Sequence, residues 1–302
     1  PRVVALLYLM LLIGMIGSAL IFAALLKDFG YVRLIQVIQS AAVVTLLLNV
    51  VAMFKQEVRR PDLTAHALAR PTFGSAWRDF ITLPHARRLL WALGLGTMGF
   101  TMQDILLEPY GAQVLGLSVS GTTMLTAIFA GGMVLGLLIT ARSLAKGTDP
   151  ILIASIGVLF GVAAFSLVCL SALVDSSSLF QLGVVLIGFG HGLFAVGMLT
   201  AAMMFGGKKM VGLTLGAWGA VQATASGVAV FSGGAIRDLV SSWGELGLLG
   251  MAMRSPAAGY LSVYIFEVAL LFLALASLGP LARRVMTSGN SADGLKLVDF
   301  PN

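Results

Sequence analysis

Long apolar runs separated by short polar connections dominate the chain. Eight of these runs are long enough to cross the ~30 Å hydrocarbon core of a bilayer as α-helices, because a helix rises about 1.5 Å per residue. The predicted spans cover residues 3–26, 32–54, 89–110, 119–141, 150–174, 179–205, 211–236 and 260–282. The pattern therefore predicts an all-α integral membrane protein with about eight transmembrane helices.

The one long polar connection, residues 55–88, separates two predicted spans from six. It is rich in arginine and contains two Arg-Pro steps, which argue against one continuous helix through it. If this loop is cytoplasmic, the alternation of spans puts all but four of the 19 basic residues on the same side, as the positive-inside rule expects. The exceptions are Lys27, Arg33, Arg237 and Arg254. The loop and the C-terminus are therefore predicted to be cytoplasmic.

Four regions follow from this arrangement. Residues 1–54 are predicted to be the last two helices of an N-terminal bundle, residues 55–88 the basic loop, residues 89–284 a six-helix C-terminal bundle, and residues 285–302 a cytoplasmic tail. Two spans followed by six is the pattern of a two-half transporter that lacks its first helices. The chain begins at Pro1, at the edge of an apolar run, so we expect further N-terminal helices in the natural protein.

Composition supports the membrane assignment and narrows the function classes. Of the 302 residues, 58% are hydrophobic and 11% are charged, and the mean hydropathy is +0.98. Soluble domains carry roughly 25% charged residues. The pI of about 9.8 does not indicate nucleic-acid binding, because the basic residues lie between apolar runs rather than along one face. The one cysteine, Cys169, lies inside an apolar run, which excludes a disulfide framework and a thiol metal site.

The most informative polar residues lie inside the third predicted span. Gln103, Asp104 and Glu108 fall within six positions, and charge at membrane depth is costly enough to indicate function. In one continuous helix, a stripe of polar and small residues would line a single face that must contact protein or a cavity. Its members would be Gly94, Thr97, Thr101, Asp104, Glu108 and Gly111. Pro109 is expected to bend or end this helix.

These carboxylates admit several uses. A proton relay, a cation site and a hydrogen-bonded contact with a polar ligand would each use the Asp104/Glu108 pair. The structural alternative is that Glu108 lies at the outer interface while Asp104 caps a neighbouring helix. Glu267 shares a face with Tyr260 and Tyr264 in the last span, and it needs a partner, either a tyrosine hydroxyl or a neighbouring helix.

The seventh predicted span combines a row of small residues with two polar side chains. The row contains Gly212, Gly216, Gly219, Ala223, Gly227, Val230 and Gly234. It predicts a groove in which another helix packs closely, and the same groove could admit the flat face of a ring system. Trp218 and Gln222 lie one turn apart on a different side. Arg237 and Asp238 are expected to form an interfacial ion pair at the helix end.

One histidine lies among glycines in the sixth predicted span: His191 is flanked by Gly188, Gly190 and Gly192. A neutral imidazole there could coordinate the magnesium of a chlorin, with the glycines leaving room for the macrocycle. The alternative is a hydrogen bond to a neighbouring group. No residue is predicted to bind a metal directly in any other way.

Motifs of membrane and soluble enzymes are missing. The sequence contains no HExxH, no P-loop and no GxSxG. An intramembrane prenyltransferase needs two Asp-rich magnesium motifs, and only the Asp104/Glu108 pair comes near one. We therefore expect a protein that is not an enzyme.

Four segments carry a family resemblance. They are MQDILLEPYGAQVLGLSVSGTTMLTA (102–127), ARSLAKGTDP (141–150), LIGFGHGLFAVGMLTAAM (186–203) and LGAWGAVQATASGVAVFSGGAIRD (215–238). Together they resemble the PucC/LhaA family, the light-harvesting complex assembly proteins of phototrophic bacteria. The likeness covers most of residues 79–284, while the first 54 residues resemble the family only in hydropathy.

The resemblance implies a fold. The family belongs to the major facilitator superfamily, whose members have twelve spans in two bundles, so this chain would hold the fifth to the twelfth. The superfamily's loop signature survives here only as Gly136, Arg142 and Gly147. That departure weakens the case for ordinary alternating-access transport.

The resemblance also implies a function: a non-enzymatic assembly factor for the LH1 or LH2 antenna complexes in the intracytoplasmic (chromatophore) membrane, part of the bacterial inner membrane. Its expected partners are the antenna α and β polypeptides and the surrounding lipid, with the reaction centre–LH1 complex as a further candidate. Bacteriochlorophyll is the candidate cofactor, although no residue requires it. The candidate contacts are His191, Gln103, Asp104, Glu108, Trp218, Gln222 and Glu267. The alternative function is a proton-coupled secondary transporter in which Asp104, Glu108 and Glu267 bind protons.

Overall fold

The computed structural model describes residues 2–27, 30–54, 72–83, 85–205 and 207–288. Every regular element in these ranges is a helix, which confirms the predicted all-α class. In chain order the elements are α1 (Arg2–Leu25), α2 (Tyr31–Ala52), α4 (Phe73–Thr82), α5 (Ala86–Thr101), the 3-10 helix η1 (Met102–Ile105), α6 (Leu107–Gln113), α7 (Val119–Ala145), α8 (Pro150–Leu173), α9 (Ser177–Phe205), α10 (Gly207–Glu245), the 3-10 helix η2 (Met251–Arg254) and α11 (Ala257–Ser288).

Five helices are long and apolar enough to cross a membrane, judged by length and composition: α2, α7, α8, α9 and α11. They correspond to five of the eight predicted spans. The apolar segment Met10–Leu25 of α1 is shorter than these five. Helix α10 has 39 residues and extends beyond both ends of the predicted span 211–236.

The prediction of one continuous helix over residues 89–110 is wrong. Helix α5 ends at Thr101, η1 follows, and α6 begins at Leu107. Pro109 does not cause the break, because it lies in the first turn of α6, where a missing N–H removes no helical hydrogen bond. The break changes the direction of the side chains after Thr101, so the predicted stripe does not form one face.

Glycines on α7, α8 and α9 bring these three helices into backbone contact. A Cβ atom at Gly190 of α9 would lie 2.7 Å from the carbonyl oxygen of Gly157 on α8, and one at Gly192 would lie 2.7 Å from that of Met133 on α7. A Cβ at Gly188 would collide with the Phe129 carbonyl. Close approach through small residues is the usual basis of helix association in a bilayer.

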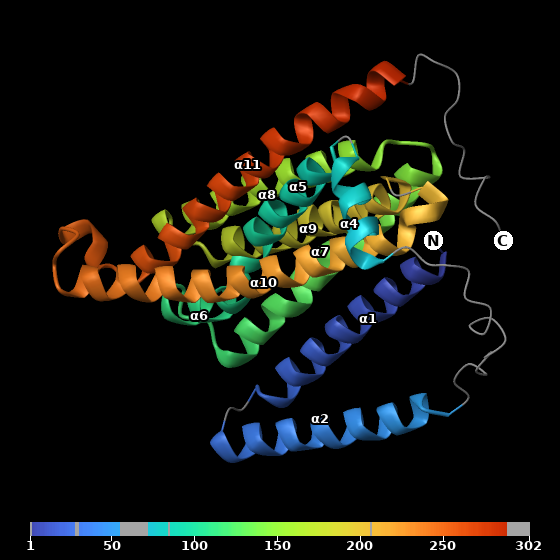
Figure 1. Ribbon diagram of the computed structural model, residues 1–302. Helices are drawn as coiled ribbons and strands as arrows, with labels where there is room; N and C mark the ends of the chain where they lie inside the picture. The colour runs from blue at the N-terminus through green and yellow to red at the C-terminus, as the bar shows by residue number, and fades with distance from the viewer. Residues whose placement is uncertain (1, 28–29, 55–71, 84, 206, 289–302) are drawn as a thin grey trace.

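Helices α5, α10 and α11 complete the bundle around a shared core (Figure 1). The core contains Phe100 of α5 and Leu271 of α11, both fully buried. The short helix α4, which the sequence analysis missed inside the polar connection, packs at one end of the bundle, where Phe80 contacts Ala86 and Ala217.

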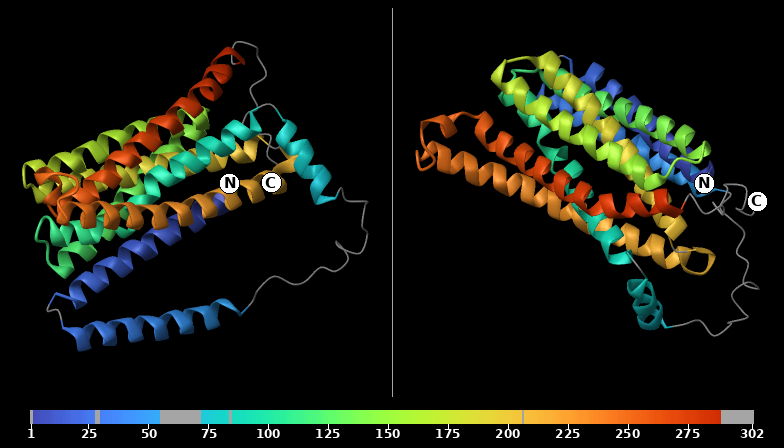
Figure 2. Two further views of the ribbon diagram at one scale, coloured as in Figure 1. Left: turned by 60° about the vertical axis from the view of Figure 1, so that its left-hand side comes forward. Right: turned by 90° about the horizontal axis from the view of Figure 1, so that it is seen from above.

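The first two helices lie on the outside of the bundle. Helix α1 packs against α7, and the Ser120 hydroxyl donates a hydrogen bond to the Ala23 carbonyl at 2.8 Å. Helix α2 stands apart from the bundle in Figure 2, and Val37 is its one buried residue among those described. Most of the apolar surface of α2 is therefore available to lipid or to other helices.

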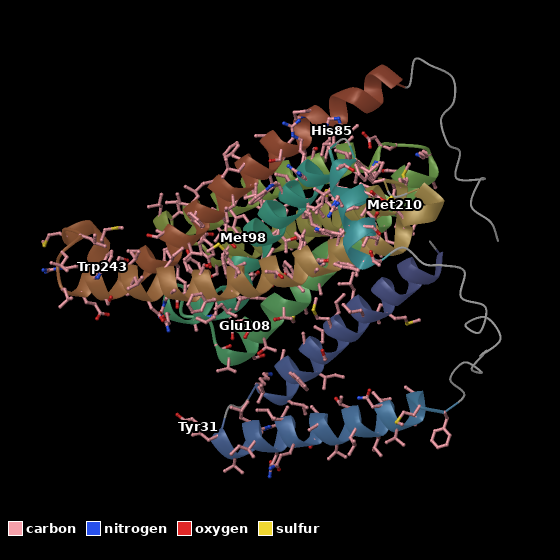
Figure 3. The ribbon with its side chains drawn as sticks, in the orientation of Figure 1. Tyr31, His85, Met98, Glu108, Met210 and Trp243 are labelled. Carbon is pink, nitrogen blue, oxygen red and sulfur yellow. The ribbon has the colours of Figure 1, made fainter. Side chains whose placement is uncertain are left out.

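The helix ends gather at two opposite ends of the molecule. In Figure 3, His85 and Met210 lie at one end and Trp243 lies at the other. The end with His85 also holds α4 and the junction between α7 and α8 (Figure 1). This arrangement puts Arg142 and Lys146 at the same end as α4.

Candidate functional site

The break after α5 brings a buried carboxylate and a buried amide together. Gln103 and Glu267 are both completely buried. The backbone N–H of Gln103, the second residue of η1, donates to Oε1 of Glu267 on α11 at 2.7 Å. Glu267 therefore bonds to a neighbouring element rather than to a tyrosine hydroxyl, which decides between the two alternatives raised by the sequence.

Three buried polar atoms around this contact have no hydrogen-bond partner within the described chain. They are Oε2 of Glu267, Oε1 of Gln103 and the hydroxyl of Tyr264, one turn before Glu267. Each unsatisfied buried polar group costs about 1–3 kcal/mol, so such groups usually indicate a bound water, an ion or a functional role. The α5–η1 junction is therefore the candidate functional site inside the bundle.

Asp104 and Glu108 were predicted to face protein or a cavity. In the structure both residues are exposed on the surface of the described chain. The Gln103 side-chain amide donates to Oδ1 of Asp104 at 2.6 Å. The hydroxyl of Thr126 on α7 donates to Oε1 of Glu108 at 2.7 Å, and Figure 3 shows Glu108 at the edge of the bundle. The two carboxylates belong to different elements, η1 and α6, because the helix breaks between them.

His191 was considered as a ligand for the magnesium of a chlorin, but its surroundings do not fit this role. The positions beside the flanking glycines are filled by the backbones of α7 and α8. The imidazole stacks on Phe100, with ring centroids 5.2 Å apart and an interplanar angle of 8°, and it also contacts Phe129 at 6.1 Å. Its Nδ1 is buried and has no hydrogen-bond partner among the described residues. The glycines serve helix packing, so they leave no room there for a macrocycle.

The glycine row of α10 lies open. A Cβ at Gly212, Gly216, Gly219 or Gly227 would meet no atom within 4 Å, and one at Gly234 would only touch the side chain of Ile105 at 3.4 Å. The predicted close packing is therefore absent within the described chain, where α7, α8 and α9 provide it instead. The row is a smooth exposed face that remains available to another molecule or segment.

The two polar side chains of α10, Trp218 and Gln222, lie on a different side of the helix from this row. Trp218 is half-buried against the core, and its indole N–H is buried without a partner within the described residues. Gln222 is also half-buried. Within the described chain, neither Trp218 nor Gln222 forms a hydrogen bond with Gln103 or Glu267.

A second polar cluster lies near the far end of α10. Arg237 forms the predicted ion pair with Asp238 at 2.6 Å. Its Nη2 also donates to Oε1 of Gln113 at 2.9 Å and to the Tyr260 hydroxyl at 3.0 Å, and that hydroxyl donates to Gln113 at 2.7 Å. No local sequence pattern predicts this role of Gln113, because its partner Arg237 lies 124 positions away in the chain.

The described residues contain no evident metal-binding site. Among the residues at 2–27, 30–54, 72–83, 85–205 and 207–288, no group of three or more His, Cys, Asp or Glu side chains could hold a metal ion. At the α5–η1 junction, Glu267 and Gln103 offer a carboxylate and an amide oxygen for hydrogen bonding.

Comparison with known proteins adds the family context. The family model described as "PUCC protein" matches residues 1–286. A protein from Rhodobacter capsulatus, described as "Uncharacterized protein in puhA-bchM intergenic region", is 49% identical over 284 residues, which are 94% of this chain and 59% of that protein. "Protein PucC" from Rhodovulum sulfidophilum is 49% identical over 243 residues, 80% of this chain and 54% of the relative.

A more distant relative carries an enzyme name. The "Bacteriochlorophyll synthase 44.5 kDa chain" of Rhodobacter capsulatus is 26% identical over 246 residues, 77% of this chain and 55% of the relative. The chain spans little more than half the length of these curated relatives. No solved structure matches the chain significantly.

The family match covers nearly the entire chain and includes all four segments in which the resemblance was found. The chain belongs to the PUCC protein family.

Proposed function

We propose that this protein is a non-enzymatic assembly factor for bacterial light-harvesting antenna complexes, and that it docks antenna helices on the open glycine face of α10. Membership of the PUCC family and the relative named PucC support this proposal. The proposal includes a major-facilitator-type bundle in the intracytoplasmic membrane, with two helices of one half and six of the other. The observation that carries it is the exposed row of Gly212, Gly216, Gly219 and Gly227.

Helices associate in lipid for a different physical reason than in water. Lipid tails are as apolar as leucine, so helices associate through close backbone packing rather than through the hydrophobic effect. In this chain the glycines at the contacts of α7, α8 and α9 are already used in this way. The glycine row on α10 packs against no other helix of the described chain. It therefore offers a surface of the same kind to a single-span antenna helix.

Bacteriochlorophyll handling, as part of this proposal, would take place at the surface rather than at His191. The 3-10 helix η1 packs against α10, since a Cβ at Gly233 would lie 2.9 Å from the Met102 carbonyl. Asp104 belongs to the same 3-10 helix, so its exposed carboxylate lies near the part of α10 around Gly233. A flat apolar ring on small residues, with a polar substituent near Asp104, would use both features.

A photo-crosslinking experiment tests the docking face. A photoactivatable amino acid is placed at Ala220, exposed beside the glycine row, in the full natural protein made in antenna-producing cells. We expect a crosslink to an antenna α or β polypeptide. The same amino acid at Leu273, exposed on α11, is the control and should give no such product. Crosslinks from Ala220 only to other parts of its own chain would contradict docking at this face.

A substitution series gives an independent readout. Gly216→Leu fills the row with a bulky side chain and should reduce co-purification of antenna polypeptides several-fold. Gly279→Leu is the matched control, since a Cβ at Gly279 of α11 also meets nothing within 4 Å. Equal antenna recovery with the two variants would count against the proposal.

The alternative, a proton-coupled secondary transporter, has one specific observation in its favour. Glu267 is buried, its Oε2 has no hydrogen-bond partner among the described residues, and neither has the hydroxyl of Tyr264 one turn earlier. Buried ionisable residues within membrane spans often belong to proton pathways. Proton uptake that accompanies solute movement in vesicles, and its loss in Glu267→Gln with antenna assembly unchanged, would favour transport over assembly. Turnover of a pigment precursor by the purified protein would instead favour an enzyme.

A further inference from the structure

A polar pocket lies at the far end of α10, distinct from the α5–η1 junction and the glycine face. It has a volume of about 190 Å³ and lies between the ends of α6 and α10, η2 and the start of α11. Two arginines line it, Arg237 and Arg254. The other lining residues are Gln113, Ser241, Glu245, Ser255 and Pro256.

Close backbone packing builds this pocket. A Cβ at Gly259 of α11 would lie 2.6 Å from the Arg237 carbonyl oxygen, and one at Gly244 would collide with the Met253 carbonyl. The segment that carries Arg254 is therefore held against the last turns of α10. Gly247 has a φ of +74°, and a Cβ there would lie 2.7 Å from Nη2 of Arg254. The guanidinium thus occupies space that only a glycine leaves free.

The two guanidinium groups differ in how they are held. Arg237 is fixed by its bonds to Asp238, Gln113 and Tyr260, and its guanidinium lies 4.8 Å above the Tyr260 ring. Its Nε–H is nevertheless buried and has no acceptor in the part of the chain that the structure describes. Arg254 is exposed and has no hydrogen bond or ion pair with any described residue. The Nε–H of Arg237 and the guanidinium of Arg254 are thus donors of the pocket lining that have no acceptor among the described residues, and a negatively charged ligand would supply one.

One acidic residue, Glu245, also lines the pocket. It is exposed and forms no ion pair with either arginine within the described chain. Ser255, which accepts a hydrogen bond from the first N–H of α11, adds a hydroxyl, and the positive end of the α11 dipole lies at the same place. Two arginines and one glutamate are the charged residues of the lining, and Asp238, which pairs with Arg237, is not part of it.

We propose that this pocket binds a phosphate-type anion, either free phosphate or the phosphodiester of an anionic phospholipid. Guanidinium groups match phosphate oxygens with two parallel hydrogen bonds, which makes arginine the usual phosphate ligand. The neighbouring surface favours the lipid source: Leu246, Leu248 and Met251 are exposed, and Trp243 lies at this end of the bundle in Figure 3. Exposed apolar side chains and a tryptophan next to arginines are typical of a membrane–water interface.

Ligand-dependent thermal unfolding of the purified full-length protein in neutral detergent tests the site. The probes are phosphatidylglycerol, phosphatidylcholine and inorganic phosphate, each titrated separately. We expect phosphatidylglycerol to raise the unfolding temperature of the unaltered protein. In Arg254→Gln the apparent affinity should fall about tenfold or more, because a charge-assisted hydrogen-bond pair is lost.

Two further variants keep the proposal falsifiable. Gly247→Ala retains both arginines but displaces the Arg254 guanidinium, and it should reproduce the loss of affinity. Arg142→Gln removes an exposed arginine at the opposite end of the bundle and should leave the affinity unchanged. Stabilisation by inorganic phosphate as well as by phosphatidylglycerol would assign the site to free phosphate. No stabilisation by either anion, equal stabilisation by phosphatidylcholine, or an unchanged affinity in Arg254→Gln would overturn the proposal.

Discussion

At the residue scale, the contact between Glu267 and Gln103 joins two segments that are 164 positions apart in the chain. The sequence predicted that Glu267 needs a partner, because a carboxylate in an apolar span cannot stay unpaired. The sequence could not predict the partner itself. Glu267 accepts a hydrogen bond from the backbone N–H of Gln103, and this N–H is available only because the helix breaks after α5. By contrast, the pair of Arg237 and Asp238 was predictable because the two residues are adjacent.

Substitutions at Glu267 separate its structural role from its charge. Glu267→Gln keeps an amide oxygen that can accept from the Gln103 N–H, so we expect a small change in unfolding temperature. Glu267→Ala removes the acceptor and leaves that N–H buried and unpaired, which should cost about 1–3 kcal/mol. Thermal unfolding of the two purified variants measures the difference. Equal unfolding temperatures would contradict a structural role for this hydrogen bond.

The start of α8 depends on one side chain outside the span. Oδ1 of Asp149 accepts from the Ile151 N–H at 2.9 Å, so Asp149 caps the helix. Burial raises the pKa of the Asp149 carboxyl above its ordinary value, and the Ile151 hydrogen bond partly opposes this. Because the pKa is higher in the folded than in the unfolded protein, the ionised carboxyl lowers stability as the pH rises through the folded pKa.

We therefore expect Asp149→Asn to preserve the cap and to remove this pH dependence, since asparagine cannot ionise. Asp149→Ala should cost about 1 kcal/mol through the lost cap. Unfolding temperatures of both variants across a pH series give the answer. A loss in Asp149→Asn as large as in Asp149→Ala would mean that the charge, not the cap, stabilises α8.

At the scale of the helices, the existence of the apolar elements could be predicted and their irregularities could not. Long apolar runs specify α7, α8 and α9 because each run is long enough for a span. The break at η1 depends on tertiary contacts with Glu267 and with α10, and Pro109, the local signal, suggested a different position. The glycine patterns of α9 and α10 look alike in sequence, yet Gly188, Gly190 and Gly192 of α9 pack against other helices. Gly212, Gly216, Gly219 and Gly227 of α10 meet no atom of the described chain within 4 Å.

Two adjacent glycines of α7 test the packing between helices. A Cβ at Gly132 would collide with the Val185 carbonyl of α9, whereas one at Gly131 meets nothing within 4 Å. Gly132→Ala should destabilise the bundle by about 1–3 kcal/mol through overpacking. Gly131→Ala is expected to be neutral or slightly stabilising, because alanine favours a helix. The comparison uses unfolding temperatures, and similar losses in both variants would contradict the contact with α9.

At the scale of the whole molecule, the positive-inside pattern predicts how the bundle is oriented. The structure groups α4 with the α7–α8 junction at one end, and the orientation of that end toward the cytoplasm stays a prediction. It follows from basic residues that cluster in alternate connections. Helix α2, which stands apart from the bundle, shows what hydropathy alone cannot supply: it identifies a span but not its neighbours.

Cysteine labelling tests this orientation. In a background with Cys169→Ala, a cysteine at Lys146 should react with a membrane-impermeant thiol reagent only from the cytoplasmic face of vesicles. A cysteine at Leu248, exposed at the opposite end, should react only from the other face. The reverse pattern would invert the predicted topology, and labelling of both positions from one face would contradict a spanning bundle.

The length of α10 has a mechanical consequence. Thirty-nine residues correspond to about 58 Å at about 1.5 Å per residue, roughly twice the thickness of the hydrocarbon layer. Such a rod protrudes from the layer or leans within it, and a tilt of about 10° around its midpoint would carry each tip by roughly 5 Å. The first three turns contact the cluster around α4 through Met210 and Ala217, and the opposite end bears the two-arginine pocket. If α10 crosses the bilayer as predicted, a displacement of one end of this rod would also displace the end at the opposite membrane surface.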